Sequence, residues 1–291
     1  MPNILAPQGR CSQTPSVLVL GGTGKTGHRI VDRLTAKGVP TRVGSRRGAI
    51  PFDWGSPSGW SAALDAMEVA YVNYAPDLAI PGAPETIADF VESARAAGLR
   101  RLVLLSGRGE AGAETCERIV LSSGLEATVV RASWFNQNFT EGAFLPMVQG
   151  GTIALPAGDI PEPFIDADDI ADVAVAAMTE PDWVGEVLEV TGPRAMTFAE
   201  IAREIVRASG RSINFVQISH DAFLEDVSRC GAPKDVVWLL DYLFSTVLDG
   251  RNVGLGDGVQ RVLGRDPKDF STFACEAAVT GIWSQAASKI L

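Results

Sequence analysis

The segment VLVLGGTGKTG at residues 17–27 constrains the fold more than any other part of this chain. Its four apolar residues predict a short buried strand, and its glycines predict a tight turn into a helix that begins near Lys25. Gly22, Gly24 and Gly27 match the pattern G-x-G-x-x-G. In that pattern the first glycine permits the turn, the second lets the backbone approach a pyrophosphate, and the third lets helix and strand pack closely. The segment therefore predicts a dinucleotide site, and with it redox chemistry.

An anion at such a turn binds the free N–H groups of the helix N-terminus. Two other interpretations of the glycines are open at this stage. Gly24-Lys25-Thr26 matches the end of the P-loop pattern G-x-x-x-x-G-K-[ST], but that pattern needs a glycine where Val19 stands. The segment is alternatively an ordinary glycine-rich turn. The predicted diphosphate-binding residues are Gly21, Thr23, Gly24, Lys25, Thr26 and Gly27.

The tip of the second predicted strand indicates which cofactor the site takes. An NAD site expects Asp or Glu about twenty residues after the glycines, where it binds the ribose hydroxyls. Here the strand 41–44 ends in Ser45, Arg46 and Arg47, whose hydroxyl and guanidinium groups suit a 2′-phosphate. We therefore expect NADP(H) rather than NAD, the alternative being a solvated basic turn. Asp53, after a further short predicted strand, lies near the adenine edge or caps a turn.

Strands and helices alternate along the first two thirds of the chain. Strands are predicted at 17–20, 41–44, 68–73, 101–105, 127–130 and 187–190, with helices at 84–97, 113–123 and 166–178. The alternation predicts an α/β fold with a Rossmann-like doubly wound parallel sheet. Beyond Arg131 the rhythm changes, with a predicted strand at 213–217 and helices near 139–148, 197–209, 221–229, 234–248 and 270–282.

We expect this fold to form one domain over residues 16–291, after a flexible leader at residues 1–15. The segments 132–164 and 192–291 are expected to build a small, helix-rich substrate lobe over the carboxyl ends of the strands.

The composition limits the partners. The 291 residues carry a formal net charge of −10, which argues against nucleic acid. The sequence has no apolar run long enough to span a membrane and no signal peptide, so we expect a cytoplasmic protein that acts on a small-molecule substrate. Its four cysteines and two histidines show no clustered spacing, so no metal site is predicted. Monomer and homodimer are both open.

Several motifs, taken in order, resemble one family. They are the glycine turn at 21–27, SRR at 45–47, LLSG at 104–107, VRASWFNQNF at 130–139, PFIDADDIA at 163–171 and VTGP at 190–193. Together they resemble the NmrA-like group of atypical short-chain dehydrogenase/reductases, and within it the bacterial relatives of the fungal festuclavine and agroclavine dehydrogenases. The resemblance implies a Rossmann core, NADP(H) and a small, variable C-terminal substrate lobe. It leaves the substrate open.

The chain lacks the dyad Tyr-x-x-x-Lys, with which ordinary short-chain dehydrogenases protonate a carbonyl oxygen. The residues four positions after Tyr71, Tyr74 and Tyr242 are Ala75, Leu78 and Thr246. Hydride addition to an iminium carbon needs no proton donor, and a quinone takes its protons from water. We therefore expect an NADPH-dependent reductase of a C=N bond or another conjugated acceptor in a small, flat molecule. The alternatives are a quinone or enone reductase and a non-catalytic NADP-binding sensor.

Candidate pocket residues follow the carboxyl ends of the predicted strands, where ligands bind in open α/β sheets. Asn73, Tyr74, Ser106 and Gly107 are predicted to lie beside the cofactor, and Ser106 and Tyr74 are the candidate catalytic residues. The predicted substrate pocket contains Arg108, Trp134, Phe135, Asn138, Trp238 and Tyr242. Each has a plainer alternative, such as a capping serine, a solvated arginine or a packing aromatic.

Overall fold

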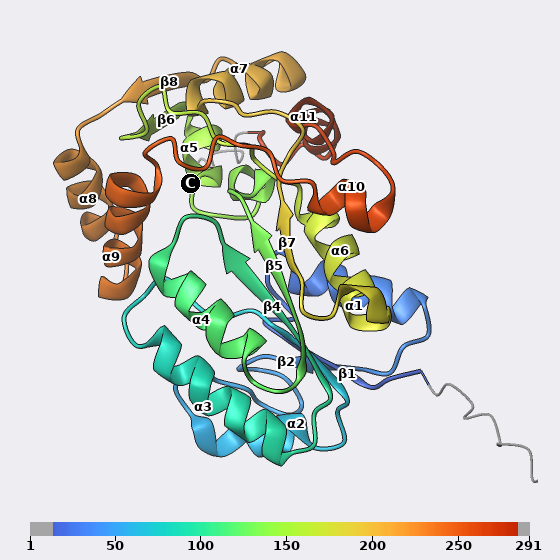
Figure 1. Ribbon diagram of the computed structural model, residues 1–291. Helices are drawn as coiled ribbons and strands as arrows, with labels where there is room; N and C mark the ends of the chain where they lie inside the picture. The colour runs from blue at the N-terminus through green and yellow to red at the C-terminus, as the bar shows by residue number, and fades with distance from the viewer. Residues whose placement is uncertain (1–13, 285–291) are drawn as a thin grey trace, which may run out of the picture.

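A six-stranded sheet forms the centre of the computed structural model, which describes residues 14–284 (Figure 1). Its strands are β1 (Val17–Leu20), β2 (Thr41–Gly44), β3 (Val69–Val72), β4 (Arg101–Gly107), β5 (Glu126–Ala132) and β7 (Val187–Val190). They pair in the order β2-β1-β3-β4-β5-β7, and every pair is parallel. The chain runs outward from β1 to β2 in one direction and from β3 onward in the other. Doubly wound sheets bind ligands beyond the carboxyl ends at such a reversal.

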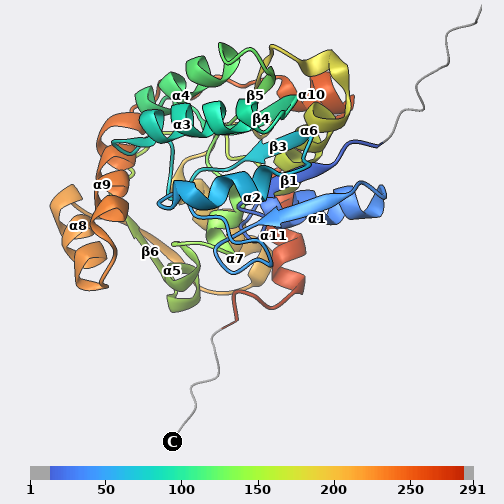
Figure 2. The ribbon, with the colours of Figure 1, turned by 90° about the horizontal axis from the view of Figure 1, so that it is seen from below.

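Successive side chains of each strand point to opposite faces of the sheet, and both faces are buried. Leu18 and Leu20 of β1 lie on the face covered by α2 (Trp60–Leu64), α3 (Ala83–Ala96) and α4 (Ala111–Leu121). Val17 and Val19 lie on the face covered by α1 (Gly27–Ala36), α6 (Ala167–Thr179) and α10 (Gly258–Leu263). The helices on the two sides of the sheet are seen in Figures 1 and 2.

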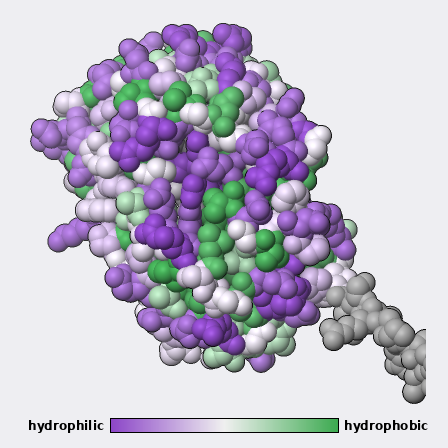
Figure 3. Space-filling view, viewed as in Figure 1, coloured by the Kyte–Doolittle hydropathy of each residue, from purple (hydrophilic) through white to green (hydrophobic). Residues whose placement is uncertain are grey.

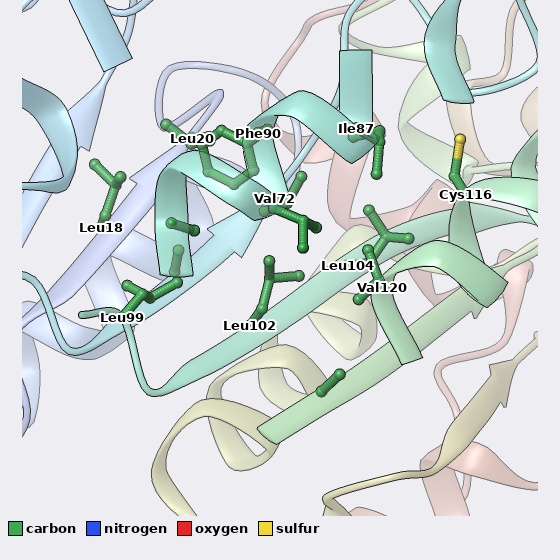
Figure 4. Packing of buried hydrophobic residues seen from close by; sticks show 14 of the residues in the cluster. Leu18, Leu20, Val72, Ile87, Phe90, Leu99, Leu102, Leu104, Cys116 and Val120 are labelled. Carbon is green, nitrogen blue, oxygen red and sulfur yellow. The ribbon is translucent and has the colours of Figure 1, made fainter. Parts of the chain in front are cut away.

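Helices α3 and α4 pack on the sheet through the cluster of buried hydrophobic side chains drawn in Figure 4. Phe90 of α3 and Val120 of α4 are completely buried over Leu102 and Leu104 of β4. This core fixes the direction in which β3 and β4 end, and therefore the position of the residues that follow them.

A lobe covers the carboxyl ends of β4 and β5 (Figure 1). It consists of α5 (Leu145–Gly150), α7 (Phe198–Ser209), α8 (His220–Arg229), α9 (Lys234–Tyr242), α11 (Phe270–Val279) and the parallel pair β6 (Thr152–Leu155) and β8 (Asn214–Gln217). Its own core is rich in aromatic rings, among them Phe139, Phe164, Phe198 and Phe270. Although α10 follows most of the lobe in sequence, it packs on α6 and β7 of the main sheet.

The Rossmann-like sheet predicted from the sequence is confirmed. The predicted strand before Phe52 is wrong: a single bridge joins Ser45 and Pro51, because proline has no N–H with which to extend a ladder. The predicted helix 234–248 is α9 followed by a π-helical turn, Leu243–Val247. Strand β6 was not predicted, because four residues show little periodicity without their partner β8. Of the predicted leader, residues 1–13 lie outside the described residues.

Hydrophilic residues cover much of the face seen in Figure 3, where apolar residues gather in a central column. Elsewhere, large exposed apolar side chains such as Val216, Leu255 and Val279 lie far apart in the sequence. Single exposed residues of this kind are normal and mark no interface. Within residues 14–284, no helix has both the length and the apolar character needed to cross a bilayer.

Candidate functional site

Close backbone contacts that only glycine permits shape the turn between β1 and α1. Gly21 has a φ of +67°, and a Cβ on Gly27 would lie 2.1 Å from the Gly21 carbonyl oxygen. A Cβ on Gly22 would lie 2.8 Å from Cγ1 of Val43 in β2. Side chains are therefore excluded at these positions, and α1 begins directly against the sheet.

The same turn presents hydrogen-bond donors at the positive end of the α1 dipole. Among residues 14–284, the backbone N–H groups of Thr23, Lys25 and Thr26 bond to no backbone carbonyl. Burial lowers the pKa of the Lys25 ammonium, and nearby Glu141 opposes that shift. The Thr26 hydroxyl is buried and accepts a hydrogen bond of 2.9 Å from Tyr71, which ties the start of α1 to β3. Free amides and a lysine around a side-chain-free turn fit the diphosphate of a dinucleotide.

The residues predicted to select NADP lie at the carboxyl end of β2. Ser45 is partly buried, whereas Arg46 and Arg47 are exposed. Asp53 adopts the plainer of its two predicted roles, since its carboxylate accepts a hydrogen bond of 3.0 Å from the Gly55 N–H and caps a turn. The basic tip therefore faces solvent, where a phosphate can reach both guanidinium groups.

A cavity of about 390 Å³ lies at the carboxyl ends of β3, β4 and β5. It brings together the predicted residues Lys25, Thr26, Asn73, Tyr74, Ser106, Gly107, Arg108, Trp134, Phe135 and Asn138. Further walls are apolar or acidic and include Leu78, Leu105, Phe144, Leu239, Leu240, Leu243, Asp77, Glu110 and Glu162. The cavity thus runs from the cofactor turn to the lobe.

Ser106 is held in a buried polar network rather than free to donate a proton. Its hydroxyl donates a hydrogen bond of 2.6 Å to Glu117 Oε1. Glu117 in turn pairs with Arg131, whose other guanidinium nitrogen lies 2.9 Å from Glu189. The Ser106 hydroxyl proton already binds a carboxylate. We therefore infer that Ser106 stabilises the end of β4 and is not the catalytic acid.

Tyr74 and Asn73 follow β3 and border the cavity beside the glycine turn. The Tyr74 ring lies 4.9 Å from that of Trp54, centroid to centroid. The Trp54 indole N–H donates to the Asn73 carbonyl at 3.3 Å. The Asn73 amide occupies the space where a Cβ of Gly21 would lie, with Nδ2 at 3.0 Å. These contacts fix both residues against the cofactor end of the cavity.

Trp134, Phe135 and Asn138 follow β5 and form the wall that faces the lobe. Trp134 stacks on Phe144 with centroids 6.2 Å apart and an interplanar angle of 14°. The Asn138 backbone carbonyl accepts a hydrogen bond of 3.2 Å from the Phe144 N–H, and this bond closes the loop between the two residues. Trp134 is half-buried and Phe144 is buried, so the Trp134 ring offers the flat surface to a planar molecule.

Arg108 borders the cavity, but its guanidinium is already bonded. It donates to the carbonyls of Asn252 and Gly254 at 2.9 and 3.0 Å. Glu189 lies 3.4 Å away. Arg108 therefore joins the segment after α9 to the end of β4 and also borders the cavity, where a substrate contact was predicted.

Trp238 and Tyr242, which were predicted to line the substrate pocket, are not among the residues that line this cavity. Trp238 is 38% exposed and stacks on Tyr242, whose hydroxyl accepts a hydrogen bond of 3.2 Å from the Ala111 N–H. The cavity is lined instead by Leu239, Leu240 and Leu243, on the neighbouring face of the same helical segment. The four-residue spacing identified one face of α9, but the cavity is lined by leucines from the adjoining face.

Three acidic residues in the cavity were missed by the sequence analysis. Glu110 and Glu162 are 6% and 0% exposed, and each has a buried carboxylate oxygen that no donor of the described residues reaches. Burial raises the pKa of Glu162 to about 7. Asp77 and Glu110 follow β3 and β4, so their positions alone could have suggested them, whereas nothing in the sequence marks Glu162. In the described part of the chain, no three His, Cys, Asp or Glu residues are grouped as a metal site requires.

Comparisons with known proteins agree with this geometry. The NmrA-like family matches residues 114–260. The chain is 32% identical to YesF, an uncharacterized oxidoreductase of Bacillus subtilis, over 92% of this chain and 98% of the relative. It is 31% identical to festuclavine dehydrogenase of Aspergillus fumigatus, over 89% of this chain and 96% of the relative.

Among solved structures, the Escherichia coli NADPH-dependent quinone oxidoreductase QOR2 complexed with NADPH has a TM-score of 0.74. The two sequences are 20% identical, and the match covers 89% of this chain and 99% of that chain. This likeness shows a shared fold.

Proposed function

Because the chain belongs to the NmrA-like family and resembles oxidoreductases over about nine-tenths of its length, we propose that it is an NADPH-dependent reductase. The acceptor is a C=N bond, in particular an iminium, or another conjugated group in a small, flat molecule. One observation carries the proposal: a single cavity joins the glycine turn to aromatic and apolar walls beyond β3, β4 and β5.

The residues that would hold the cofactor are distributed from the turn to the end of β2. The amides of Thr23 and Lys25 suit the diphosphate, and Arg46 and Arg47 suit a 2′-phosphate. When bound, the cofactor supplies a hydride. The proposed preference for NADP over NAD depends on these two arginines and on the absence of an acidic residue at the end of β2.

The protein's own contribution to the reaction is orientation and exclusion of water. Trp134 and Tyr74 border the cavity with flat rings, and Leu239, Leu240 and Leu243 cover it from the lobe. An iminium loses its positive charge when hydride adds to carbon, so no side chain has to donate a proton. Catalysis then depends on holding the acceptor close to the hydride donor.

A neutral quinone or enone is the second candidate acceptor, because the leucine and aromatic walls also suit an uncharged ring. A single assay tests both: NADPH absorbance is followed with purified protein and, in turn, a cyclic iminium and a quinone. We expect oxidation of NADPH with the iminium at the higher kcat/KM. Tight NADP binding without turnover on any acceptor would contradict the reductase and support a redox sensor.

A further inference from the structure

Glu110 occupies an unusual position at the edge of the cavity. Its carboxyl group packs directly on Gly107, the last residue of β4, where a Cβ would lie 2.3 Å from Glu110 Oε1. The side chain stands at the start of α4 but caps no amide of that helix. One of its oxygens, Oε2, is buried with no donor among residues 14–284. The absence of a side chain at the end of β4 leaves the space that this carboxyl group fills.

Asp77 lies beside Glu110, so that two carboxyl groups adjoin at this edge of the cavity. The Asp77 carboxylate accepts the Ala79 N–H at 2.9 Å, which fixes its orientation in the loop after β3. Burial and the adjacent Asp77 charge raise the pKa of Glu110 well above its usual range. Two carboxyl groups this close resist being ionised together, and a cation bound beside them would favour their ionised forms.

Neither acid is neutralised by the protein, in contrast to its neighbours. Among the described residues, no Lys, Arg or His lies within 4 Å of the Asp77 or Glu110 carboxylates, whereas Glu117 pairs with Arg131 and Glu189 with Arg108 and Arg131. A buried carboxylate without a partner is costly in free energy. A cation that entered the cavity would supply the missing partner.

We propose that Glu110 and Asp77 form a subsite for the positively charged nitrogen of the acceptor, and that this protein therefore selects cationic, flat, aromatic molecules over neutral ones. The inference rests on the proposed function for the identity of the site, and it deepens that function by naming the substrate class. The apolar wall of Leu78 and Leu105 and the rings of Tyr74 and Trp134 suit the body of such a molecule.

The subsite also accounts for turnover in an iminium reduction. Binding of the cation favours ionisation of the carboxyl pair, and a proton released from the pair goes to solvent. Hydride then forms the new C–H bond, and the π electrons of C=N become the lone pair of a neutral amine. NADPH is oxidised, the acceptor is reduced, and no proton is consumed in the step. The product has lost the charge that the carboxylates bound, which favours its release.

The test uses equilibrium binding to the NADP⁺-saturated protein, in which no hydride is available. The probes are N-methylquinolinium and 1-methylnaphthalene, which share size and shape and differ by one positive charge. Calorimetry in two buffers of different ionisation enthalpy measures affinity and proton release together. We expect the wild type to bind the cation about tenfold more tightly or better, with release of a proton.

Glu110→Gln should abolish this selectivity while the affinity for 1-methylnaphthalene stays the same. Glu114→Gln is the matched control, because Glu114 is exposed one turn further along α4. Asp77→Asn keeps Glu110 but removes the other carboxylate of the subsite, so both the preference for the cation and the proton release should fall. This second variant also decides the matter if Glu110→Gln does not fold.

Equal affinity for the two probes in the wild type, or unchanged cation selectivity in Glu110→Gln, would overturn the subsite. The outcome is separable from that of the proposed function, because binding and NADPH oxidation are measured independently. Cation selectivity without turnover would support the subsite and contradict the proposed reductase function. Turnover without cation selectivity would support the reductase function and contradict the subsite.

Discussion

The two ends of the cavity are built in different ways and present groups of opposite kinds. The end formed by the glycine turn presents backbone amides and the Lys25 ammonium. The end under the lobe presents the carboxyl groups of Asp77, Glu110 and Glu162, which a bound cation would favour in their ionised forms. The net charge of −10 for the whole chain does not reveal this difference between the two ends. A site that brings an anionic dinucleotide to a cationic acceptor needs this local separation more than it needs any net charge.

The two ends also differ in what fixes them. The turn is defined by close contacts of its glycines with backbone of the same turn and with Val43 and Asn73 of the neighbouring strands, so that an added side chain would clash. The lobe end is assembled from segments after β3, β4, β5 and α9, which meet only in the folded chain. We therefore expect substitutions at the first end to act through backbone geometry, and those at the second to act through charge.

The largest effect is expected for Gly27→Ala. The new Cβ would lie 2.1 Å from the Gly21 carbonyl oxygen and 2.7 Å from the Gly22 Cα, and backbone atoms cannot move aside cheaply. We expect a loss of about 3 kcal/mol or more of folding free energy, together with loss of NADP binding. Denaturant unfolding and calorimetry measure the two.

Gly150→Ala is the control for this variant. Gly150 is exposed, and a Cβ there would meet nothing within 4 Å. Its stability and NADP binding should stay near those of the wild type. Equal behaviour of the two alanine variants would show that the turn is not fixed by its backbone.

At the opposite end, Glu162→Gln should change how stability depends on pH. Burial raises the Glu162 pKa from 4.5 to about 7, so the folded state holds its proton more tightly than the unfolded state does. Wild-type stability should therefore fall between about pH 4.5 and pH 7 and stay low above that range. The variant should be more stable than the wild type by up to about 3 kcal/mol at pH 8, and equal to it at pH 4.

Urea unfolding at the two pH values measures this difference, with the exposed Glu114→Gln as the reference. If wild type and Glu162→Gln showed the same pH dependence, Glu162 would be ionised in the folded state and could not be one of the unpaired acids of the lobe end.

The same contrast explains what the sequence could predict. The parallel sheet follows from local apolar runs and glycines, and that prediction was confirmed. Trp238 and Tyr242 lie outside the cavity lining, because a spacing of four identifies a helix face without saying what covers it. Glu162 gave no signal, since its neighbours in the fold, Ser133 and Asn252, are far away in sequence.

Arg46→Ala tests the outer part of the cofactor end. A guanidinium bound to a 2′-phosphate contributes about 1.5–3 kcal/mol, which corresponds to roughly ten- to hundredfold in affinity. We expect NADPH binding to weaken by that factor while NADH binding stays nearly constant. Fluorescence titration with both nucleotides measures it, and the exposed Arg95→Ala on α3 serves as the control. Equal losses for the two nucleotides would remove the case for a phosphate at the tip of β2.

The smallest effect is expected for Tyr74→Phe, and it separates charge from proton transfer at the lobe end. Tyr74 is the one tyrosine in the cavity wall, and its ring is held by Trp54. A general acid typically contributes about 10²–10⁴-fold to the rate. If hydride addition to an iminium needs no acid, removal of the hydroxyl should change kcat by less than about threefold. With a quinone, whose reduction does consume protons, the same variant shows whether Tyr74 delivers one. A hundredfold loss with the iminium would mean that the acceptor is neutral when hydride arrives, and that the acidic end of the cavity holds a proton and not a cation.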